Sequence, residues 1–488
     1  MEIARRPISF VIIGASGDLA RKKIYPALFS LYSLGYLPED FLVFGFARTR
    51  MDRSTFLERI GAHLTCRYAP AEHCPLHVRA FLDRCHYVDG EYDSVDSFLE
   101  LEKAMRSCEK DRSDRLFYLA IPPSVFLPTV QTIGNAGMVN CCTDAPRTHV
   151  ILEKPFGRDR RTSDELVGAV SEVFREEQVF RIDHYLGKEV IQNLLVLRFA
   201  NLIFEPIWNR TYVKNVEIVW KEDIGVEGRG GYFDDFGIIR DVLQNHLLQI
   251  LALLAMEPPS RFQPRNLAAE KLRVLEAIPP VRAEDIVIGQ YGPATVEGTR
   301  MSGYREDASV GDDSRTPTFA AVRLAVENHR WKGVPFYVTA GKALDDKMTE
   351  IRIQFYELAH NIFCEPTTCP RPNRLVIRVQ PDESISLHIT NKVPGMAMEI
   401  AQHRLNLQYK TTFDKTIPEA YERLLLDVIQ GDRGQFIGAE ELAAAWDVFT
   451  PILDRIDREA WMPQPYEFGG KGPDLTPLHR SGDSERAW

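Results

Sequence analysis

The N-terminal part of the chain alternates short apolar runs with segments of helical composition, and this alternation constrains the fold more than any other feature. Four apolar runs, each short enough for a buried strand, occupy residues 10–13, 41–46, 116–120 and 149–153. Strands that alternate with helices favour a parallel sheet with helices on both faces. We therefore predict an α/β N-terminal domain built on a Rossmann-like, doubly wound sheet.

A turn of small residues follows the first of these runs. It has the pattern G-x-x-G-x-x-A, at Gly14, Gly17 and Ala20, and joins the first predicted strand to the first predicted helix. Small residues let backbone amides approach a pyrophosphate at a helix N-terminus. An ordinary tight turn can have the same composition, but this place in the fold favours a dinucleotide site. The predicted contacts are Gly14, Ser16, Gly17, Asp18 and Leu19.

The residues after the second run indicate which dinucleotide is preferred. A site for NAD usually places an acid there, whereas this chain has Arg48. A guanidinium binds a 2′-phosphate with two parallel hydrogen bonds, and an acid would repel it. We therefore predict that NADP is preferred over NAD and that Arg48 is the main contact. Tyr118 and Pro122, at the end of the third run, are candidates for the nicotinamide half.

The segment R-I-D-H-Y-L-G-K-E, residues 181–189, concentrates chemically active side chains between a strand-like run and a helix-like run. If a helix begins near His184, then His184 and Lys188 lie one turn apart, with Tyr185 beside them. Free N–H groups at the helix start would add to a phosphate site. Asp183 would be repelled by a phosphate, so we expect it to orient a base instead. A charged strand-to-helix corner with no ligand fits the spacing equally well.

The same segment resembles the active-site motif of the glucose-6-phosphate dehydrogenase family. Four further stretches resemble that family in the same order, namely residues 14–26, 153–157, 228–246 and 341–344. The resemblance covers nearly the whole chain and weakens after about Pro463. It implies oxidation of glucose 6-phosphate at C1 to 6-phospho-glucono-1,5-lactone, with hydride transfer to NADP, the first step of the oxidative pentose phosphate pathway.

The resemblance also assigns the catalytic base. It implies that His246 takes the proton of the C1 hydroxyl, and we assign Asp183 as the carboxylate that orients the imidazole. His246 lies in an apolar helical segment that also contains Asp241. The two are five residues apart, so a regular helix would not place them on one stripe.

The remaining substrate contacts follow from the same resemblance. Lys154 belongs to an E-K-P triplet and is expected to reach both coenzyme and sugar. His184, Tyr185 and Lys188 are expected to hold the 6-phosphate, and Lys23 and Lys347 to add charge near it, although relatives often carry arginine in place of Lys347. The side chains expected to bind sugar hydroxyls are Glu222, Asp241 and Lys342.

Two alternatives remain open at this point. An NAD(P)-dependent dehydrogenase of unphosphorylated sugars can share the E-K-P triplet, but it has no need of the phosphate-binding side chains of His184, Tyr185 and Lys188. A catalytically silent NADPH-binding regulator would be expected to lack the base, its carboxylate partner or those side chains.

The C-terminal half predicts a second domain of α+β class. Alternating strands at residues 350–356, 374–379, 384–390 and 405–409 indicate a large, mainly antiparallel sheet covered by helices. Residues 288–319 are rich in Gly, Asp, Ser and Thr and are expected to form a long loop. The expected domains are residues 1–180, which bind NADP, and residues 181–488, which bind substrate and support a homodimer or homotetramer. A second, structural NADP site is not favoured, because Met348 and Pro372 stand where basic residues are common in relatives that have one.

Composition excludes other classes of function. A net charge of −10 gives no broad footprint for nucleic acid. The longest apolar run, residues 247–256, is far below the roughly 20 residues of a membrane span. The eight cysteines include no C-x-x-C pair, so we expect reduced thiols and no metal site. With no secretory pattern at the N-terminus, we expect a cytoplasmic protein.

Overall fold

A computed structural model describes residues 6–68, 71–110, 112–140, 146–364, 369–413 and 415–479. The chain forms two compact units. The first comprises Met1–Lys188, Arg261–Ala268 and Thr416–Ala443, and the second comprises Glu189–Ser260, Ala269–Lys415 and Ala444–Trp488. We expected continuous domains at residues 1–180 and 181–488. The units are discontinuous because residues from the C-terminal third complete the core of the first unit.

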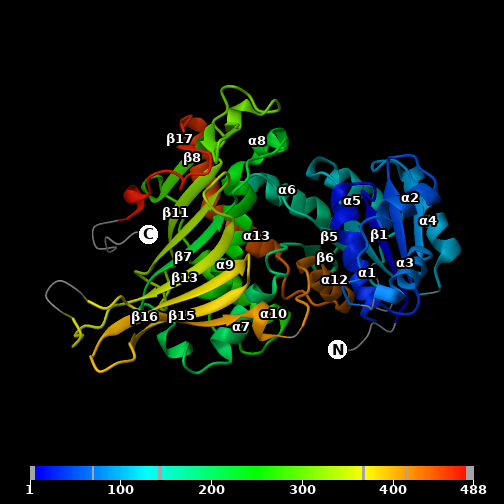
Figure 1. Ribbon diagram of the computed structural model, residues 1–488. Helices are drawn as coiled ribbons and strands as arrows, with labels where there is room; N and C mark the ends of the chain where they lie inside the picture. Colours follow the sequence, from blue (N-terminus) through cyan, green and yellow to red (C-terminus); the bar gives the residue numbers. More distant parts are fainter. Residues whose placement is uncertain are drawn as a thin grey trace. The chain divides into compact units, whose positions relative to one another are not determined.

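The first unit is built on a six-stranded sheet in the order β3-β2-β1-β4-β5-β6. Every neighbouring pair in this sheet is parallel. Helices cover both of its faces (Figure 1). The strands are β1 Ile8–Ile13, β2 Phe41–Ala47, β3 Cys85–Asp89, β4 Asp114–Leu119, β5 Thr148–Leu152 and β6 Val179–Arg181. The predicted Rossmann-like sheet is therefore confirmed.

Most helices of this unit lie between its strands. They are a π-helix η1 Ala20–Ile24 continuing into α1 Tyr25–Ser33, then α2 Arg53–Gly61, α3 Cys74–Leu82, α4 Val95–Cys108, α5 Phe126–Asn135 and α6 Arg160–Ser171, with 3₁₀ turns η2 Ala71–His73, η3 Pro123–Val125 and η4 Glu176–Gln178. Helix α12, Ala420–Gln430, comes from much later in the chain. Its Leu424, Leu425 and Val428 are buried in one hydrophobic cluster with Ile12 of β1 and Leu28 of α1.

The second unit is built on a nine-stranded sheet in the order β16-β15-β14-β13-β7-β12-β11-β8-β17. The pairs β7–β12 and β8–β17 are parallel and the other pairs are antiparallel, as the predicted mainly antiparallel sheet required. The strands are β7 Val213–Lys221, β8 Ile286–Gly292, β11 Phe319–Ala325, β12 Pro335–Gly341, β13 Met348–Phe355, β14 Arg374–Gln380, β15 Ser384–Lys392, β16 Ile400–Gln408 and β17 Gln464–Glu467.

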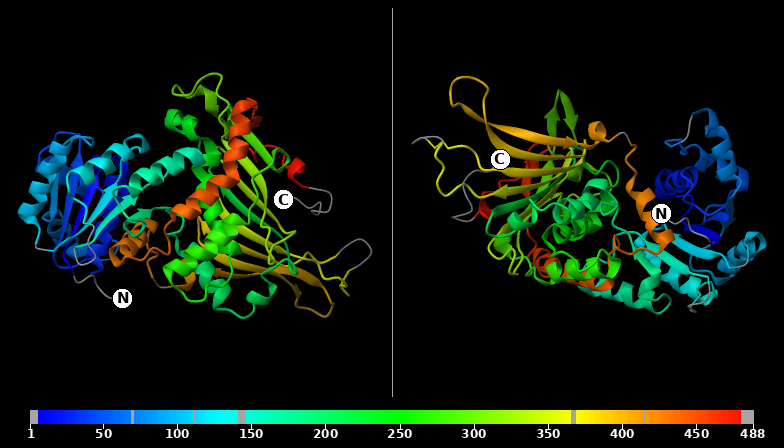
Figure 2. Two further views of the ribbon diagram at one scale, coloured as in Figure 1. Left: turned by 180° about the vertical axis from the view of Figure 1, so that it is seen from behind. Right: turned by 90° about the horizontal axis from the view of Figure 1, so that it is seen from below.

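Helices pack on one face of this sheet (Figures 1 and 2). They include α7 Glu189–Phe199, α8 Gly230–Ile238, a π-helix η6 Ile239–Leu247, α9 Leu248–Ala255, α10 Pro264–Glu276 and α13 Ala439–Arg458. The unit also contains a short α11 Tyr409–Thr412 and 3₁₀ turns η5 Glu205–Ile207, η7 Ala283–Asp285, η8 Tyr304–Glu306 and η9 Thr476–Leu478. Residues 264–268 of α10 and 439–443 of α13 are grouped with the first unit. Strand β14 alternates buried and half-buried residues, as a sheet with one covered face requires.

The helical segment Gly230–Ala255 is long and apolar enough to pass a test for a membrane span, although 89% of its scored window is buried inside the protein. A core helix passes the same test on length and composition. The segment packs against strand β12 and helix α7 of its own unit.

Two expectations about the C-terminal half and the thiols are wrong. Residues 288–319 are not a single long loop: β8 covers Ile286–Gly292, and a hairpin of β9 Ala294–Val296 and β10 Thr299–Met301 follows. The glycines of β8 obscured its apolar pattern, although the strand is almost wholly buried.

The thiols are also not all reduced. Disulfides join Cys66 to Cys74 and Cys364 to Cys369, with Cα–Cα distances of 5.7 and 4.3 Å. The paired cysteines are 8 and 5 residues apart in sequence, whereas our expectation of reduced thiols looked for C-x-x-C spacing. Cys85 and Cys108 are free, and the adjacent Cys141 and Cys142 lie outside the described residues.

Candidate active site

The glycine-containing turn lies over the carboxyl ends of strands β1 and β4, where the strand order of the first sheet reverses. Gly14 has φ +89°, and a Cβ at this position would lie 2.3 Å from the Ala120 carbonyl oxygen. Only glycine permits this approach. The Gly17 N–H donates to the Gly14 carbonyl at 2.9 Å and closes the turn. A sheet of this kind binds ligands at such a reversal, so the turn suits a dinucleotide.

The side chains of the turn fit an anionic ligand. Hydrogen bonds from Lys22 and Arg21 lower the pKa of the Asp18 carboxyl, so its negative charge is compensated locally. Ser16 and Thr49 share a hydrogen bond of 3.1 Å between their hydroxyls, which links the turn to the segment after β2. Leu19 immediately precedes the π-helix η1.

Arg48 lies directly after β2 and is exposed. Its guanidinium carbon is 5.3 Å from the centroid of the Tyr92 ring, a cation–π contact that restricts the side chain. Burial raises the pKa of Tyr92, so the ring stays a neutral platform. Arg48 therefore presents an accessible guanidinium at this strand end, a group that can bind a phosphate with two hydrogen bonds.

The E-K-P triplet follows β5. Glu153 is buried and accepts a hydrogen bond of 2.5 Å from the Tyr118 hydroxyl. Burial raises the pKa of Glu153, while hydrogen bonds from Tyr118 and from Tyr421 of α12 oppose this rise. Lys154 comes next and precedes a cis peptide bond to Pro155. Tyr118 therefore contacts the triplet through Glu153, whereas Pro122 is exposed at the start of η3.

The sequence prediction missed Glu153 and Tyr421. A buried acid next to Lys154 was visible in the triplet itself, and a strand of five apolar or neutral residues ending in glutamate could have drawn attention to it. Tyr421 has no such mark, since more than two hundred residues separate it from Glu153 along the chain.

The segment 181–189 differs from the prediction in its backbone. Helix α7 begins at Glu189, not near His184, and residues 184–187 form turns. The Asp183 carboxylate accepts the Tyr185 N–H at 2.9 Å, which favours a turn over a helix start. A Cβ on Gly187 would lie 2.6 Å from the Ala420 carbonyl oxygen, so α12 packs tightly against this turn.

The turn still gathers the predicted phosphate-binding side chains. The Lys188 ammonium lies 5.1 Å from the centroid of the Tyr185 ring, and the His184 and Tyr185 ring centroids are 5.0 Å apart. The His184 ring is also nearly parallel to the Tyr421 ring, at 6.3 Å. These three polar side chains, His184, Tyr185 and Lys188, are hereafter the phosphate cluster.

The phosphate cluster is adjacent to the E-K-P triplet. Leu152 of β5 is paired with Arg181 of β6, and the Ile182 N–H donates to the Leu152 carbonyl at 2.9 Å. Lys154 and His184 therefore follow neighbouring parallel strands at the same edge of the sheet. Lys23 is exposed and forms an ion pair of 3.4 Å with Glu419, the residue before α12.

The second unit contains the other predicted sugar contacts. The Lys342 ammonium lies 2.5 Å from a Glu222 carboxylate oxygen and 5.4 Å from the centroid of the Phe233 ring. Both charged side chains are only half-buried, so together they offer a donor and an acceptor to a hydroxyl group. Lys347 is exposed, and its own N–H donates to the Asp346 carboxylate at 2.7 Å.

His246 and Asp241 lie in the π-helix η6, which removes our objection to their spacing. A π-helix bonds residue i to residue i+5, so residues five apart are one turn apart. His246 is 2% exposed and Asp241 is half-buried. The Asn245 side-chain oxygen accepts the backbone N–H of His246 at 2.6 Å. The expected pairing of His246 with Asp183 stays a prediction, because the two residues belong to different units.

The first unit is of Rossmann type and has a dinucleotide turn, and the second has a large sheet and a buried histidine in a helix. Together they define an NAD(P)-dependent oxidoreductase. Family models give the particular family. The N-terminal, NAD-binding domain model of glucose-6-phosphate dehydrogenase matches residues 11–193, and the C-terminal domain model of the same family matches residues 195–488.

Individual relatives agree with the family models. The chain is 49% identical over 471 residues to the chloroplastic glucose-6-phosphate 1-dehydrogenase 3 of Arabidopsis thaliana, covering 96% of this chain and 78% of the relative. A solved glucose-6-phosphate dehydrogenase in complex with its substrate glucose-6-phosphate is 41% identical, with a TM-score of 0.90 and coverage of 97% of both chains. The chain belongs to the glucose-6-phosphate dehydrogenase family.

The relatives contradict the expected cytoplasmic location. Relatives from Arabidopsis thaliana, Nicotiana tabacum, Spinacia oleracea and Solanum tuberosum that are 47–49% identical to this chain are chloroplastic enzymes. The expectation was wrong because it rested on the lack of a secretory pattern, which does not distinguish the cytoplasm from a plastid.

Proposed function

We propose that this protein oxidises D-glucose 6-phosphate at C1 to 6-phospho-D-glucono-1,5-lactone with NADP as the hydride acceptor, the first step of the oxidative pentose phosphate pathway. The observation that carries the substrate assignment is the phosphate cluster, where an imidazole, a phenol and an ammonium share one turn. An uncharged sugar would not need this concentration of donors. Family membership supports the reaction class.

The residues divide the work by the chemistry of their side chains. His184, Tyr185 and Lys188 hold the 6-phosphate, with Lys23 and Lys347 adding positive charge. Glu222, Asp241 and Lys342 orient sugar hydroxyls. Lys154 lies at the sheet edge between the phosphate cluster and the dinucleotide turn, where it can contact both coenzyme and sugar.

The coenzyme is held by the turn from Gly14 to Leu19, by Arg48 and by the Tyr118–Pro122 strand end. A coenzyme held there would supply the hydride acceptor for C1. We propose NADP over NAD, because Arg48 offers a guanidinium where an acid would select a free ribose hydroxyl.

His246 acts as general base and removes the proton of the C1 hydroxyl as C1 is oxidised. A neutral imidazole suits this role near pH 7. We propose that Asp183 bonds the other ring nitrogen and stabilises the imidazolium. We also propose that the protein assembles as a homodimer or homotetramer, which light scattering would test.

The experiment follows absorbance of the reduced coenzyme with glucose 6-phosphate and with glucose at equal concentration. The expected result is turnover with the phosphorylated sugar and at least about 10²-fold lower kcat/KM with glucose, since a site built to bond a polar group can reject an analogue without it by up to about 10⁴–10⁵. His246→Asn should lower kcat by at least about 10²-fold while glucose 6-phosphate still binds.

Lys188→Gln is the matched variant for binding. It should raise KM for glucose 6-phosphate and leave the already weak reaction with glucose unchanged. Equal rates with both sugars would remove the substrate assignment. Full turnover by His246→Asn would remove His246 from the role of base.

A further inference from the structure

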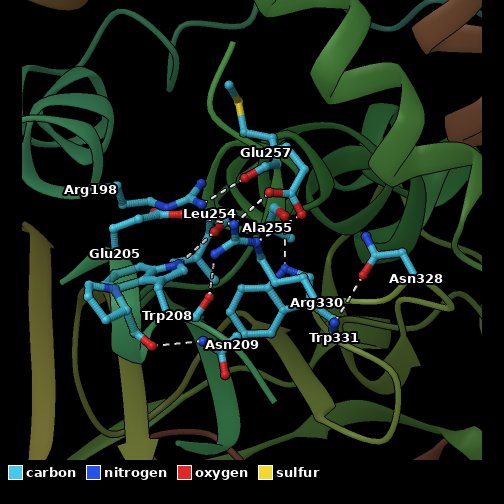
Figure 3. Close-up of polar contacts among 12 residues, drawn as sticks. Arg198, Glu205, Trp208, Asn209, Leu254, Ala255, Glu257, Asn328, Arg330 and Trp331 are labelled. Atoms are coloured by element: carbon cyan, nitrogen blue, oxygen red, sulfur yellow. Dashed lines mark hydrogen bonds and ion pairs between the residues drawn. The ribbon is translucent and has the colours of Figure 1, made fainter. Parts of the chain in front are cut away.

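The helix that carries His246 ends in an unusual set of contacts. The last C=O groups of any helix lack partners within the helix. Here four consecutive carbonyls, those of residues 253–256, each accept a hydrogen bond from a side chain (Figure 3). Arg198 donates to Leu253 at 2.9 Å and to Met256 at 2.7 Å.

Two tryptophans complete this set. The indole N–H of Trp208 donates to the Leu254 carbonyl at 2.9 Å, and that of Trp331 donates to the Ala255 carbonyl at 2.8 Å. Arg198, Trp208 and Trp331 have no solvent exposure. They come from the end of α7, from the segment after η5 and from the segment before β12, and are hereafter the carbonyl clamp.

Charged neighbours make the carbonyl clamp rigid. Arg330 donates to Glu257 at 2.6 Å and to Glu205 at 2.8 Å, and also to the Trp208 carbonyl at 3.0 Å. Glu205 and Glu257 offset the two guanidinium groups, and the negative end of the helix dipole favours Arg198. A buried arginine is costly unless its partners are fixed, so this cluster tolerates little movement of the helix end.

The position of the carbonyl clamp relates it to the proposed base. His246 lies near the end of the π-helix η6, and α9 connects it directly to residues 253–256. Every residue of α9 is buried. An α-helix turns by about 100° per residue, so slippage of the π-helix by one residue would rotate the imidazole away from its direction. A fixed C-terminal end prevents that slippage, because it would break the four carbonyl contacts.

We propose that Arg198, Trp208 and Trp331 are positioning residues for His246: by holding the carbonyls at the end of its helix, they set the orientation of the imidazole. This inference rests on the proposed role of His246 as the base.

Trp331→Phe tests the proposal with the least disturbance, since it keeps an aromatic ring and removes the single N–H that Ala255 uses. We expect kcat to fall about tenfold, less than the roughly 10²-fold cost of a 1 Å misplacement. KM for glucose 6-phosphate should stay within about twofold, because the phosphate cluster is untouched. Hydrogen exchange should become faster at the amides of residues 239–249.

Arg198 offers a graded pair. Arg198→Met removes the charge and both hydrogen bonds, and Arg198→Lys restores a charge and one donor. We expect Arg198→Lys to recover part of the kcat that Arg198→Met loses. If Arg198→Met fails to fold, Trp331→Phe still decides the matter.

Ile353→Val is the control, since Ile353 is buried in β13 of the same unit and forms no contact of the clamp. It should lower the melting temperature with little change in kcat. The proposal is overturned if Trp331→Phe has the same kcat as Ile353→Val. It is also overturned if Trp331→Phe changes KM for glucose 6-phosphate as much as it changes kcat. If His246→Asn retains full turnover, the proposed role of His246 as the base fails, and this inference fails with it. If His246→Asn loses turnover and the clamp variants keep the wild-type kcat, only this inference fails.

Discussion

His149 provides a test of how burial controls charge in the first unit. Its ring lies on β5, is 7% exposed and packs against Phe180 with ring centroids 4.9 Å apart. Burial lowers the pKa of His149 to about 4, and Arg147 and Arg433 add to this effect while Asp114 and a hydrogen bond to the Val428 backbone oppose it. The folded protein therefore holds the ring neutral.

The direction of the pH dependence follows from the two states. The unfolded chain binds a proton near pH 6.5, and the folded chain does so only near pH 4. Stability from this residue is complete above about pH 6.5 and is lost as pH falls toward 4. At 1.36 kcal/mol per pH unit the full effect is about 3 kcal/mol, of which about 2 kcal/mol is lost between pH 7 and pH 5.

The assay is urea unfolding of the wild type and His149→Gln at pH 7 and pH 5. Glutamine keeps a donor and does not titrate, so the pH-independent cost of the substitution cancels when each protein is compared with itself. The wild type should lose about 2 kcal/mol more than the variant between these pH values. The exposed His73, replaced by glutamine, serves as the control and should leave the wild-type difference unchanged.

The reasoning is refuted if wild type and His149→Gln lose the same stability on acidification. That result would mean that the ring accepts a proton in the folded state, and that burial does not hold it neutral.

Two further predictions concern the coenzyme site. Arg48→Asp should shift the ratio of kcat/KM for NADP over NAD toward NAD by at least about 10²-fold, because a charge-assisted pair with the 2′-phosphate becomes a repulsion; Arg50→Asp, at a neighbouring exposed position, is the control, and equal shifts in both variants would contradict the assignment. Gly14→Ala should raise the coenzyme KM and cost about 1–3 kcal/mol in thermal unfolding, since its Cβ would meet the Ala120 carbonyl at 2.3 Å. Gly35→Ala shares a positive φ but meets nothing within 4 Å, so it should leave coenzyme binding intact.

Much of the first sheet could be predicted from the sequence because its strands are buried on both faces. Strand β1, Ile8–Ile13, is buried at every position, and its last four residues form an uninterrupted apolar run, with Ser9 the one polar residue of the strand. The turn at Gly14, directly after that run, could also be predicted, since no other residue fits its backbone.

Other features depend on contacts that no local pattern records. The helix after His184 starts late because Asp183 bonds the Tyr185 amide and Gly187 packs against α12, a helix far along the chain. The sequence of the π-helix η6 has an ordinary helical composition, so nothing in it distinguishes a π-helix from an α-helix. We therefore assumed a period of 3.6 residues, which places Asp241 and His246 on different stripes.

The late arrival of α12 affects how the protein can be synthesised. Domains at the N-terminus commonly fold first as the chain leaves the ribosome. The nucleotide-binding unit departs from that order, because side chains of α12 complete its hydrophobic core and Tyr421 supplies a partner of Glu153. A nascent chain stopped at Lys188 would expose the apolar surface that Leu424, Leu425 and Val428 later bury. The whole polypeptide must therefore be nearly finished before its first unit is complete, and a chaperone that shields that surface during translation would be of direct use to it.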